Sequence, residues 1–143
     1  MITVSFDFDD TLSKKSVQNY AKSLIDNGVN VLIVTARYSN AFLSDAAWFT
    51  DAYGKEAAEN INEDLYLVAK ELNIKKENII FMDMVYKNIY LREHKILWHL
   101  DDCYTEIMQI KQDKLCKTIP IQVNSNNWIG KCNRIIEKYG YKQ

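Results

Sequence analysis

Several features that mark special classes of protein are scarce in this sequence of 143 residues. One proline and four glycines provide no linker-like segment, so we expect a single domain over residues 1–143. The three cysteines are odd in number and lack C-x-x-C spacing, a pattern that predicts neither a disulfide framework nor a zinc site. No apolar run approaches the roughly 20 residues that cross a bilayer, and the N-terminus lacks a signal-peptide pattern. We therefore expect a cytoplasmic protein without a membrane partner.

Net charge is also nearly absent. Eighteen basic and nineteen acidic side chains leave a charge of −1 at pH 7. Overall charge therefore does not predict a nucleic-acid partner, although a phosphorylated nucleic-acid end stays open as a substrate. The motifs G-x-x-x-x-G-K-[ST] and G-x-G-x-x-G are missing, which argues against a P-loop nucleotidase or a dinucleotide enzyme.

Five short apolar runs are present, each about as long as a strand. Their continuous apolar character is typical of strands buried on both faces of a parallel sheet. They are residues 2–6, 30–34, 78–82, 96–100 and 118–123. Helix-like segments follow them at residues 17–26, 64–72, 88–93, 104–110 and 128–139. The alternation predicts an α/β fold: a doubly wound, three-layer, Rossmann-like domain with a mostly parallel five-stranded sheet.

The interval at about residues 38–63 is too long for a simple connection, and we expect a small helical insertion there. It contains Phe42, Trp48, Phe49 and Tyr53, more aromatic residues than a solvated crossover needs. Two interpretations stay open. The aromatic side chains pack on the sheet, or they form a small lid that contacts a leaving group, for instance by stacking on a nucleobase.

Two acidic clusters follow predicted strands. Asp7, Asp9 and Asp10 come directly after the first strand, and Asp101 and Asp102 end the fourth. If these strands are parallel neighbours, the carboxylates share the edge where open α/β sheets bind ligands. Oxygen ligands without His or Cys pairs nearby favour Mg²⁺, which predicts metal-assisted phosphoryl chemistry. A simple acidic turn that caps a helix is the plainer alternative.

Three further side chains stand where they can bind phosphate. Thr35 and Arg37 end the second predicted strand, and Lys87 begins the helix that leads into the fourth. A hydroxyl, an ammonium and helix N-terminal amides can together hold a phosphate. Lys95 also precedes the fourth strand, but it would enter that strand at the opposite, amino end, so Lys87 is preferred.

Taken in order, these residues resemble the haloacid dehalogenase superfamily of aspartyl-phosphate hydrolases over nearly the whole chain. Asp7, Asp9 and Thr11 match the family's D-x-D-x-T motif, and Thr35 matches the hydroxyl residue after the next strand. Lys87 matches the family's lysine, and Asp101 and Asp102 match its acidic pair. Residues 34–39, 64–66 and 98–102 resemble small phosphatase-like members of the family. The interval 11–30 leaves no room for a cap domain, so we expect a capless member. The family's fold implies the strand order five, four, one, two, three.

The resemblance implies a Mg²⁺-dependent phosphomonoester hydrolase with an aspartyl-phosphate intermediate. Asp7 would be the nucleophile, and Asp9 the general acid and base. Thr35 and Lys87 would hold the phosphoryl oxygens. The resemblance places the metal on Asp7, the Asp9 backbone carbonyl, Asp101 and Asp102, and the other substrate contacts on Thr11, Arg37 and Lys87. Small phosphates, nucleotides and phosphorylated ends of larger molecules all stay open as substrates.

Two other functions stay open. A non-catalytic scaffold would keep the fold for protein binding. A receiver-like domain would place its phosphoacceptor after the third strand, where Asp83 stands, but it would also need a lysine at the end of the fifth strand, which is missing. The two histidines, His94 and His99, lie away from the predicted carboxyl edge, and we expect packed or surface imidazoles.

Overall fold

Five parallel strands form the centre of the molecule, whose computed structural model describes residues 1–139. The strands are β1 (Thr3–Phe6), β2 (Asn30–Thr35), β3 (Ile79–Phe81), β4 (Trp98–Asp101) and β5 (Ile119–Gln122). Their order is β3-β2-β1-β4-β5, and every neighbouring pair is parallel. The expected α/β class and strand order are therefore confirmed, with the order read from the opposite edge.

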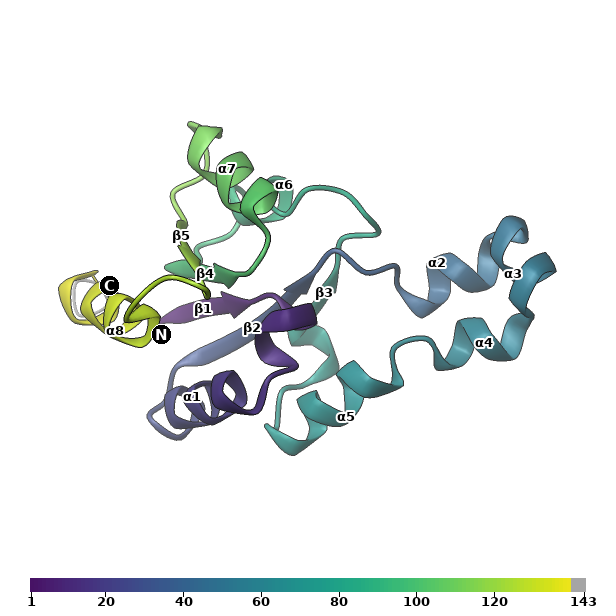
Figure 1. Cartoon of the computed structure of the whole chain (residues 1–143), viewed down its shortest axis with the longest axis horizontal. Helices are drawn as coiled ribbons and strands as arrows, with labels where there is room; N and C mark the ends of the chain where they lie inside the picture. Colours follow the sequence, from purple (N-terminus) through teal and green to yellow (C-terminus); the bar gives the residue numbers. More distant parts are fainter. Residues whose placement is uncertain (140–143) are drawn as a thin grey trace.

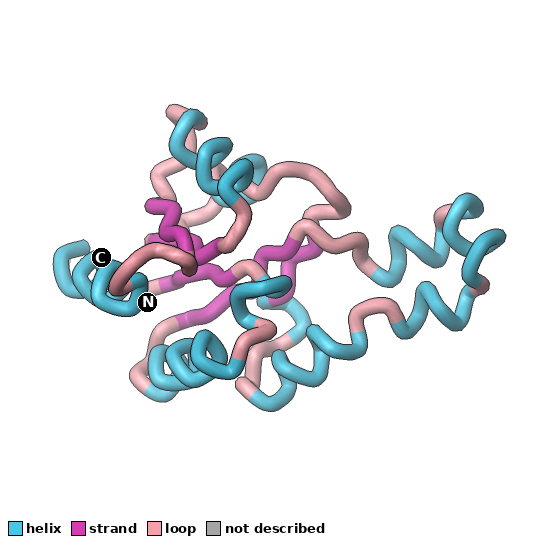
Figure 2. Tube along the Cα trace, in the orientation of Figure 1, coloured by secondary structure: helices cyan, strands magenta, loops and turns pink. Residues whose placement is uncertain are grey.

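Helices cover both faces of this sheet (Figures 1 and 2). One face carries α1 (Lys15–Asp26), α5 (Glu63–Glu71) and α8 (Trp128–Tyr139), and the other carries α6 (Asn88–Leu91) and α7 (Tyr104–Gln112). Short helical turns, η1 (Phe8–Leu12) and η2 (Lys76–Asn78), follow β1 and precede β3. Among the described residues, no helix combines the length and the apolar character that a membrane span requires.

Two apolar clusters, one on each face, explain why the strands are mostly apolar. Ile33 of β2 belongs to the larger cluster with Tyr20 of α1 and Leu65 of α5. The next residue, Val34, belongs to the smaller cluster with Ile110 of α7. Successive side chains of a strand point to opposite faces, so both must be apolar when helices cover both.

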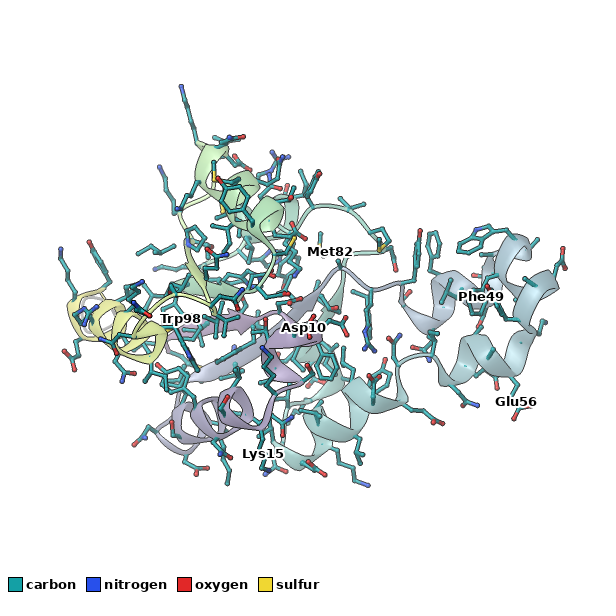
Figure 3. All side chains as sticks on the ribbon, in the orientation of Figure 1. Asp10, Lys15, Phe49, Glu56, Met82 and Trp98 are labelled. Atoms are coloured by element: carbon teal, nitrogen blue, oxygen red, sulfur yellow. The ribbon has the colours of Figure 1, made fainter. Side chains whose placement is uncertain are left out.

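Aromatic packing fixes the centre of the sheet. The rings of Phe6 on β1 and Trp98 on β4 lie edge to face with centroids 5.3 Å apart, and both side chains are fully buried. Tyr20 stacks on Trp98 at 6.4 Å, and Trp128 of α8 meets Tyr20 edge-on at 5.3 Å. Figure 3 shows Trp98 at this inner position. The two strands that carry the acidic clusters are thus rigidly paired.

The predicted boundaries hold to within a few residues, and the differences have local causes. The third strand begins at Ile79 because Lys76–Asn78 forms a helical turn ahead of it. The fourth begins at Trp98, and Ile96 packs into the smaller cluster before it. α1 ends at Asp26, and Gly28 follows with a φ of 85°, a left-handed conformation suited to glycine after a helix.

The insertion consists of α2 (Asn40–Asp45), α3 (Ala47–Tyr53) and α4 (Lys55–Asn60), which contact one another. It projects as an arm beyond the carboxyl ends of the strands (Figure 1). Its helical character matches the expectation. The backbone N–H of Phe42 donates to the Ser39 hydroxyl at the start of α2, and Gly54, with a φ of 87°, makes the turn between α3 and α4. The arm is therefore a folded unit attached at the edge that carries the acidic residues.

Candidate active site at the carboxyl edge of the sheet

Asp7 lies at the centre of the carboxyl edge, directly after β1. The register pairs Ser5 with His99 and Phe6 with Leu100, and the backbone N–H of Asp7 donates to the Leu100 carbonyl over 2.9 Å. The chain then turns through η1, and the Thr11 hydroxyl donates to Oδ2 of Asp7 over 3.2 Å. Thr11 is fully buried and Asp7 is 5 % exposed. The central position of β1 therefore fixes this carboxylate between two neighbouring strands.

Lys87 is the cation that the sequence places near Asp7, and its ammonium bridges the two acidic clusters. Its Nζ lies 2.7 Å from Oδ1 of Asp7 and 2.6 Å from Oδ2 of Asp101. The side chain is 1 % exposed, at the start of α6. Lys95, in contrast, is exposed. The structure thus brings Lys87 into the acidic cluster as expected.

Asp101 is buried, and both of its carboxylate oxygens already accept hydrogen bonds. Oδ2 receives Lys87 and the imidazole Nε2 of His99, the latter over 2.7 Å. Oδ1 accepts the backbone N–H of Cys103 over 3.0 Å. The neighbouring Asp102 is only partly buried. The two members of the acidic pair therefore differ: Asp101 holds the site together, and Asp102 faces its more open side.

A metal ion fits between three of the expected ligands. Oxygens of Asp7, Asp101 and Asp102 lie within 4.8 Å of one another. Lys87 supplies one positive charge to these three carboxyl groups, and a divalent cation beside them would favour their ionised forms. Carboxylate oxygens are also the donors that Mg²⁺ prefers. The residues present therefore suit a hard divalent cation.

Asp9 points away from this group and pairs with Arg37. Its two oxygens lie 2.7 Å from Nη2 and 2.9 Å from Nε of Arg37. The same guanidinium pairs with both oxygens of Asp64 over 2.7 and 2.9 Å, and its Nη1 also donates to Asn62 over 3.3 Å. We expected Arg37 to contact substrate; in the structure it joins Asp9 to the first turn of α5. The Asp9 side chain is not among the clustered carboxylates, in keeping with a metal contact assigned to its backbone carbonyl alone.

Thr35 ends β2 beside β1, as the sequence predicts. It is 1 % exposed, and its Oγ1 accepts the backbone N–H of Arg37 over 3.3 Å. The β1–β2 register pairs Phe6 with Ile33, which places Thr35 level with the turn that follows Asp7. The hydroxyl therefore stands at the same edge as the nucleophile candidate.

Burial and charge set the protonation of the cluster. Burial raises the pKa of Asp7 above its usual range; the Lys87 ammonium opposes this rise, and the Asp101 carboxylate adds to it. Burial would also raise the pKa of Asp101, but hydrogen bonding from His99 and the charge of Lys87 bring it below the usual range. Burial would lower the pKa of Lys87, but the two carboxylates raise it. Lys87 therefore stays an ammonium at neutral pH.

No family model, curated protein or solved structure matches this chain significantly. The functional assignment therefore depends on the residues and the geometry described above.

Three contributors to the site escape the sequence patterns. His99, expected to be a packed or surface imidazole, is fully buried but hydrogen-bonds Asp101. Glu106 of α7 accepts the backbone N–H of Lys87 over 3.1 Å, and Asp64 holds Arg37. Glu106 and Asp64 lie in the first turns of their helices, close to the carboxyl edge, and this position is the signal that could have identified them. Asp10, in contrast, is exposed and lies outside the cluster.

Proposed function

We propose that this chain is a Mg²⁺-dependent phosphomonoester hydrolase of the haloacid dehalogenase type that acts through an aspartyl-phosphate on Asp7. The observation that supports it most is the ammonium of Lys87 lying 2.7 Å from the Asp7 carboxylate and 2.6 Å from Asp101. This arrangement joins a nucleophile, a cation able to bind phosphoryl oxygens and a group of metal-ligating oxygens at one edge.

In the proposed first step, a carboxylate oxygen of Asp7 attacks phosphorus, and the bond to the leaving oxygen breaks. Lys87 and Thr35 stabilise the phosphoryl oxygens in the transition state. Asp9 gives a proton to the leaving oxygen. Asp7, the Asp9 backbone carbonyl, Asp101 and Asp102 would hold Mg²⁺, which would supply positive charge to offset that of the phosphoryl group.

In the second step, Asp9 takes a proton from water as the water oxygen attacks phosphorus, and the Asp7 carboxylate leaves with release of phosphate. Because both Asp9 oxygens pair with Arg37, protonation of Asp9 must weaken that ion pair. We therefore assign Arg37 the role of holding Asp9 between proton transfers, as a positioning residue rather than as the primary phosphate contact.

The alternatives draw less support from the site. A binding scaffold has no need for three clustered carboxylates, two of which pair with a buried ammonium, because such an arrangement is costly to desolvate. For a receiver-like domain, Asp83 would be the phosphoacceptor, but its Oδ1 accepts the Ser39 backbone N–H over 2.7 Å. Neither alternative explains why Asp7 lies at the centre of the cluster.

Hydrolysis of a panel of phosphorylated compounds, with and without Mg²⁺, tests the proposal. We expect activity that requires Mg²⁺ and stops in excess EDTA. Asp7→Asn should abolish turnover while the chain still folds, since the two side chains have nearly equal volume and the Lys87 ammonium keeps its ion pair with Asp101. Full activity of that variant would exclude the covalent mechanism, and unchanged hydrolysis in EDTA would indicate a different reaction.

A further inference from the structure

The arm formed by α2, α3 and α4 carries a chain of aromatic side chains that pack on one another. Ring centroids are 4.7 Å apart for Tyr38 and Phe42, 5.8 Å for Tyr38 and Trp48, 5.9 Å for Trp48 and Phe49, and 4.9 Å for Phe49 and Tyr53. Figure 3 shows Phe49 far out on the arm, away from the strands. These residues are therefore not part of either apolar cluster that packs against the sheet.

Much of this aromatic surface is open to solvent. Trp48 is 58 % exposed and Tyr53 is 69 % exposed. The internal contacts of a small arm do not require a tryptophan that leaves most of its surface in water. Grouped apolar surface of this kind is typical of a binding site.

Four of these aromatic residues, all except Phe42, line a pocket of about 720 Å³, a size usual for small-molecule sites. We call it the aromatic pocket. Its lining includes Arg37, Tyr38, Trp48, Phe49, Tyr53 and Met84. Met84 comes from the segment between β3 and α6, so the pocket lies where the arm meets the sheet's carboxyl edge.

Arg37 connects the aromatic pocket to the proposed catalytic groups. It lines the pocket, and the same guanidinium holds Asp9 over 2.7 Å. Asn62, which is fully buried, also lines the pocket and donates to the Tyr38 carbonyl over 3.0 Å, fixing the base of the arm. A group attached to a phosphate near Asp7 and Asp9 would therefore extend toward the aromatic rings.

Charge restricts what this group can be. Residues 38–63 contain five acidic side chains and one lysine, a net charge of −4. Arg37 is the only charged side chain lining the pocket in the described part of the chain, and two carboxylates already neutralise it. A leaving group that carries further phosphates or carboxylates would be repelled.

We propose that the aromatic pocket binds the leaving group of the phosphomonoester, and that this group is planar, largely apolar and free of negative charge, as in an aryl or heteroaryl alcohol. This assignment rests on the proposed phosphatase function. A flat ring can stack on, or meet edge-on, the four aromatic side chains that line the pocket, and the acidic arm selects against oligonucleotides and nucleoside polyphosphates.

Two kinds of measurement test the proposal separately from catalysis. In the first, 1-naphthol binding is followed by calorimetry with the wild type and with Asp7→Asn, and we expect equal affinities. Trp48→Ala and Tyr53→Ala should each weaken binding about fivefold or more, as expected for loss of an aromatic contact. Tyr139→Ala, which removes an exposed aromatic residue on α8, is the matched control and should have no effect. A sulfonated naphthol should bind the wild type more weakly than naphthol does.

In the second measurement, kcat/KM is compared for 1-naphthyl phosphate and glycerol 1-phosphate. We expect the wild type to prefer the naphthyl ester, and Trp48→Ala to lose that preference through KM with the glycerol ester unaffected. Absence of naphthol binding, or equal binding by both arm variants and the wild type, would overturn the assignment. Naphthol binding that depends on Trp48, without hydrolysis of either ester, would support the pocket's ligand preference and overturn the phosphatase proposal instead.

Discussion

His99 donates from Nε2 to Oδ2 of Asp101 over 2.7 Å, the same oxygen that receives Lys87. A carboxylate only accepts, so Nε2 carries the proton, and Nδ1 accepts from the Ser5 hydroxyl over 2.8 Å. Burial lowers the pKa of His99, in keeping with this neutral form. The imidazole thus ties Asp101 to the middle of β1, and we regard His99 as a positioning residue.

Substitution of His99 tests this role. His99→Phe removes one of the two hydrogen bonds to Oδ2 of Asp101 and leaves the buried Ser5 hydroxyl without its imidazole partner, and we expect a loss of about 1–3 kcal/mol in the free energy of unfolding. His99→Gln can still donate to Asp101 and should lose less. If Asp101 needs the imidazole for orientation, kcat should follow the same order in saturating Mg²⁺. Equal kcat in the two variants would show that His99 only packs in the core and does not orient Asp101.

Lys87→Ala should impair both stability and turnover. Without the ammonium, Asp7 and Asp101 face each other while buried, which should cost about 3–5 kcal/mol. We expect kcat/KM to fall about ten- to hundredfold through loss of a charged contact to phosphate. Mg²⁺ bound as proposed would compensate the same carboxylates, so it should raise the melting temperature of this variant more than that of the wild type.

Lys95→Ala is the matched control for that experiment. Its side chain is exposed, so neither stability nor kcat/KM should change appreciably. A larger loss of kcat/KM in Lys95→Ala than in Lys87→Ala would contradict the assignment of Lys87.

The two carboxylates that end β4 should separate metal binding from stability. Asp102 is partly exposed beside Asp7, so Asp102→Asn should weaken Mg²⁺ binding while changing the metal-free melting temperature little. Asp101→Asn disturbs Lys87 and His99 and should lower the melting temperature strongly. Calorimetric Mg²⁺ titration together with thermal unfolding in EDTA checks both. The reverse pattern would assign the direct metal contact to Asp101.

Acid should weaken the attachment of α5 at Arg37. Hydrogen bonds from Arg37 lower the pKa of Asp64. A folded-state pKa below the unfolded value of about 3.8 stabilises the fold above that pH, and the contribution disappears as pH falls through the folded-state pKa. Because Asp64 is well exposed, the contribution is about 1 kcal/mol or less. Urea unfolding of Asp64→Asn should thus differ from the wild type at pH 7 and match it near pH 2.

The corresponding control uses the partner residue. In an Arg37→Gln background, Asp64→Asn should change neither the stability at pH 7 nor its pH dependence. A persistent difference would show that Asp64 acts through another contact.

The sheet was predictable because its signal is local. Runs such as residues 31–34 are apolar at every position, as burial on two faces requires, and the β4–β1–β2 order places Asp7 between Thr35 and Asp101 as expected. The hydrogen-bond partners of Arg37 and Asp101 were harder to predict from the sequence. The Asp9–Arg37–Asp64 pairing depends on where α5 begins after the insertion, and no short-range pattern carries that information. Likewise, a histidine inside an apolar strand has the same sequence pattern whether it packs or hydrogen-bonds a carboxylate.

The pairing of β1 with β4 has a consequence for how the chain folds. Ser5 and His99 are 94 residues apart, so this pairing is among the most distant in the sheet, whereas Thr3 of β1 pairs with Asn30 of the nearer β2. Distant pairings form late because closing a long loop costs entropy first. The carboxylates of Asp7 and Asp101 therefore meet only when β4 docks, at or near the last barrier. If these carboxylates bind Mg²⁺ as proposed, refolding in Mg²⁺ should be faster, because the ion would favour the docking of β4 beside β1.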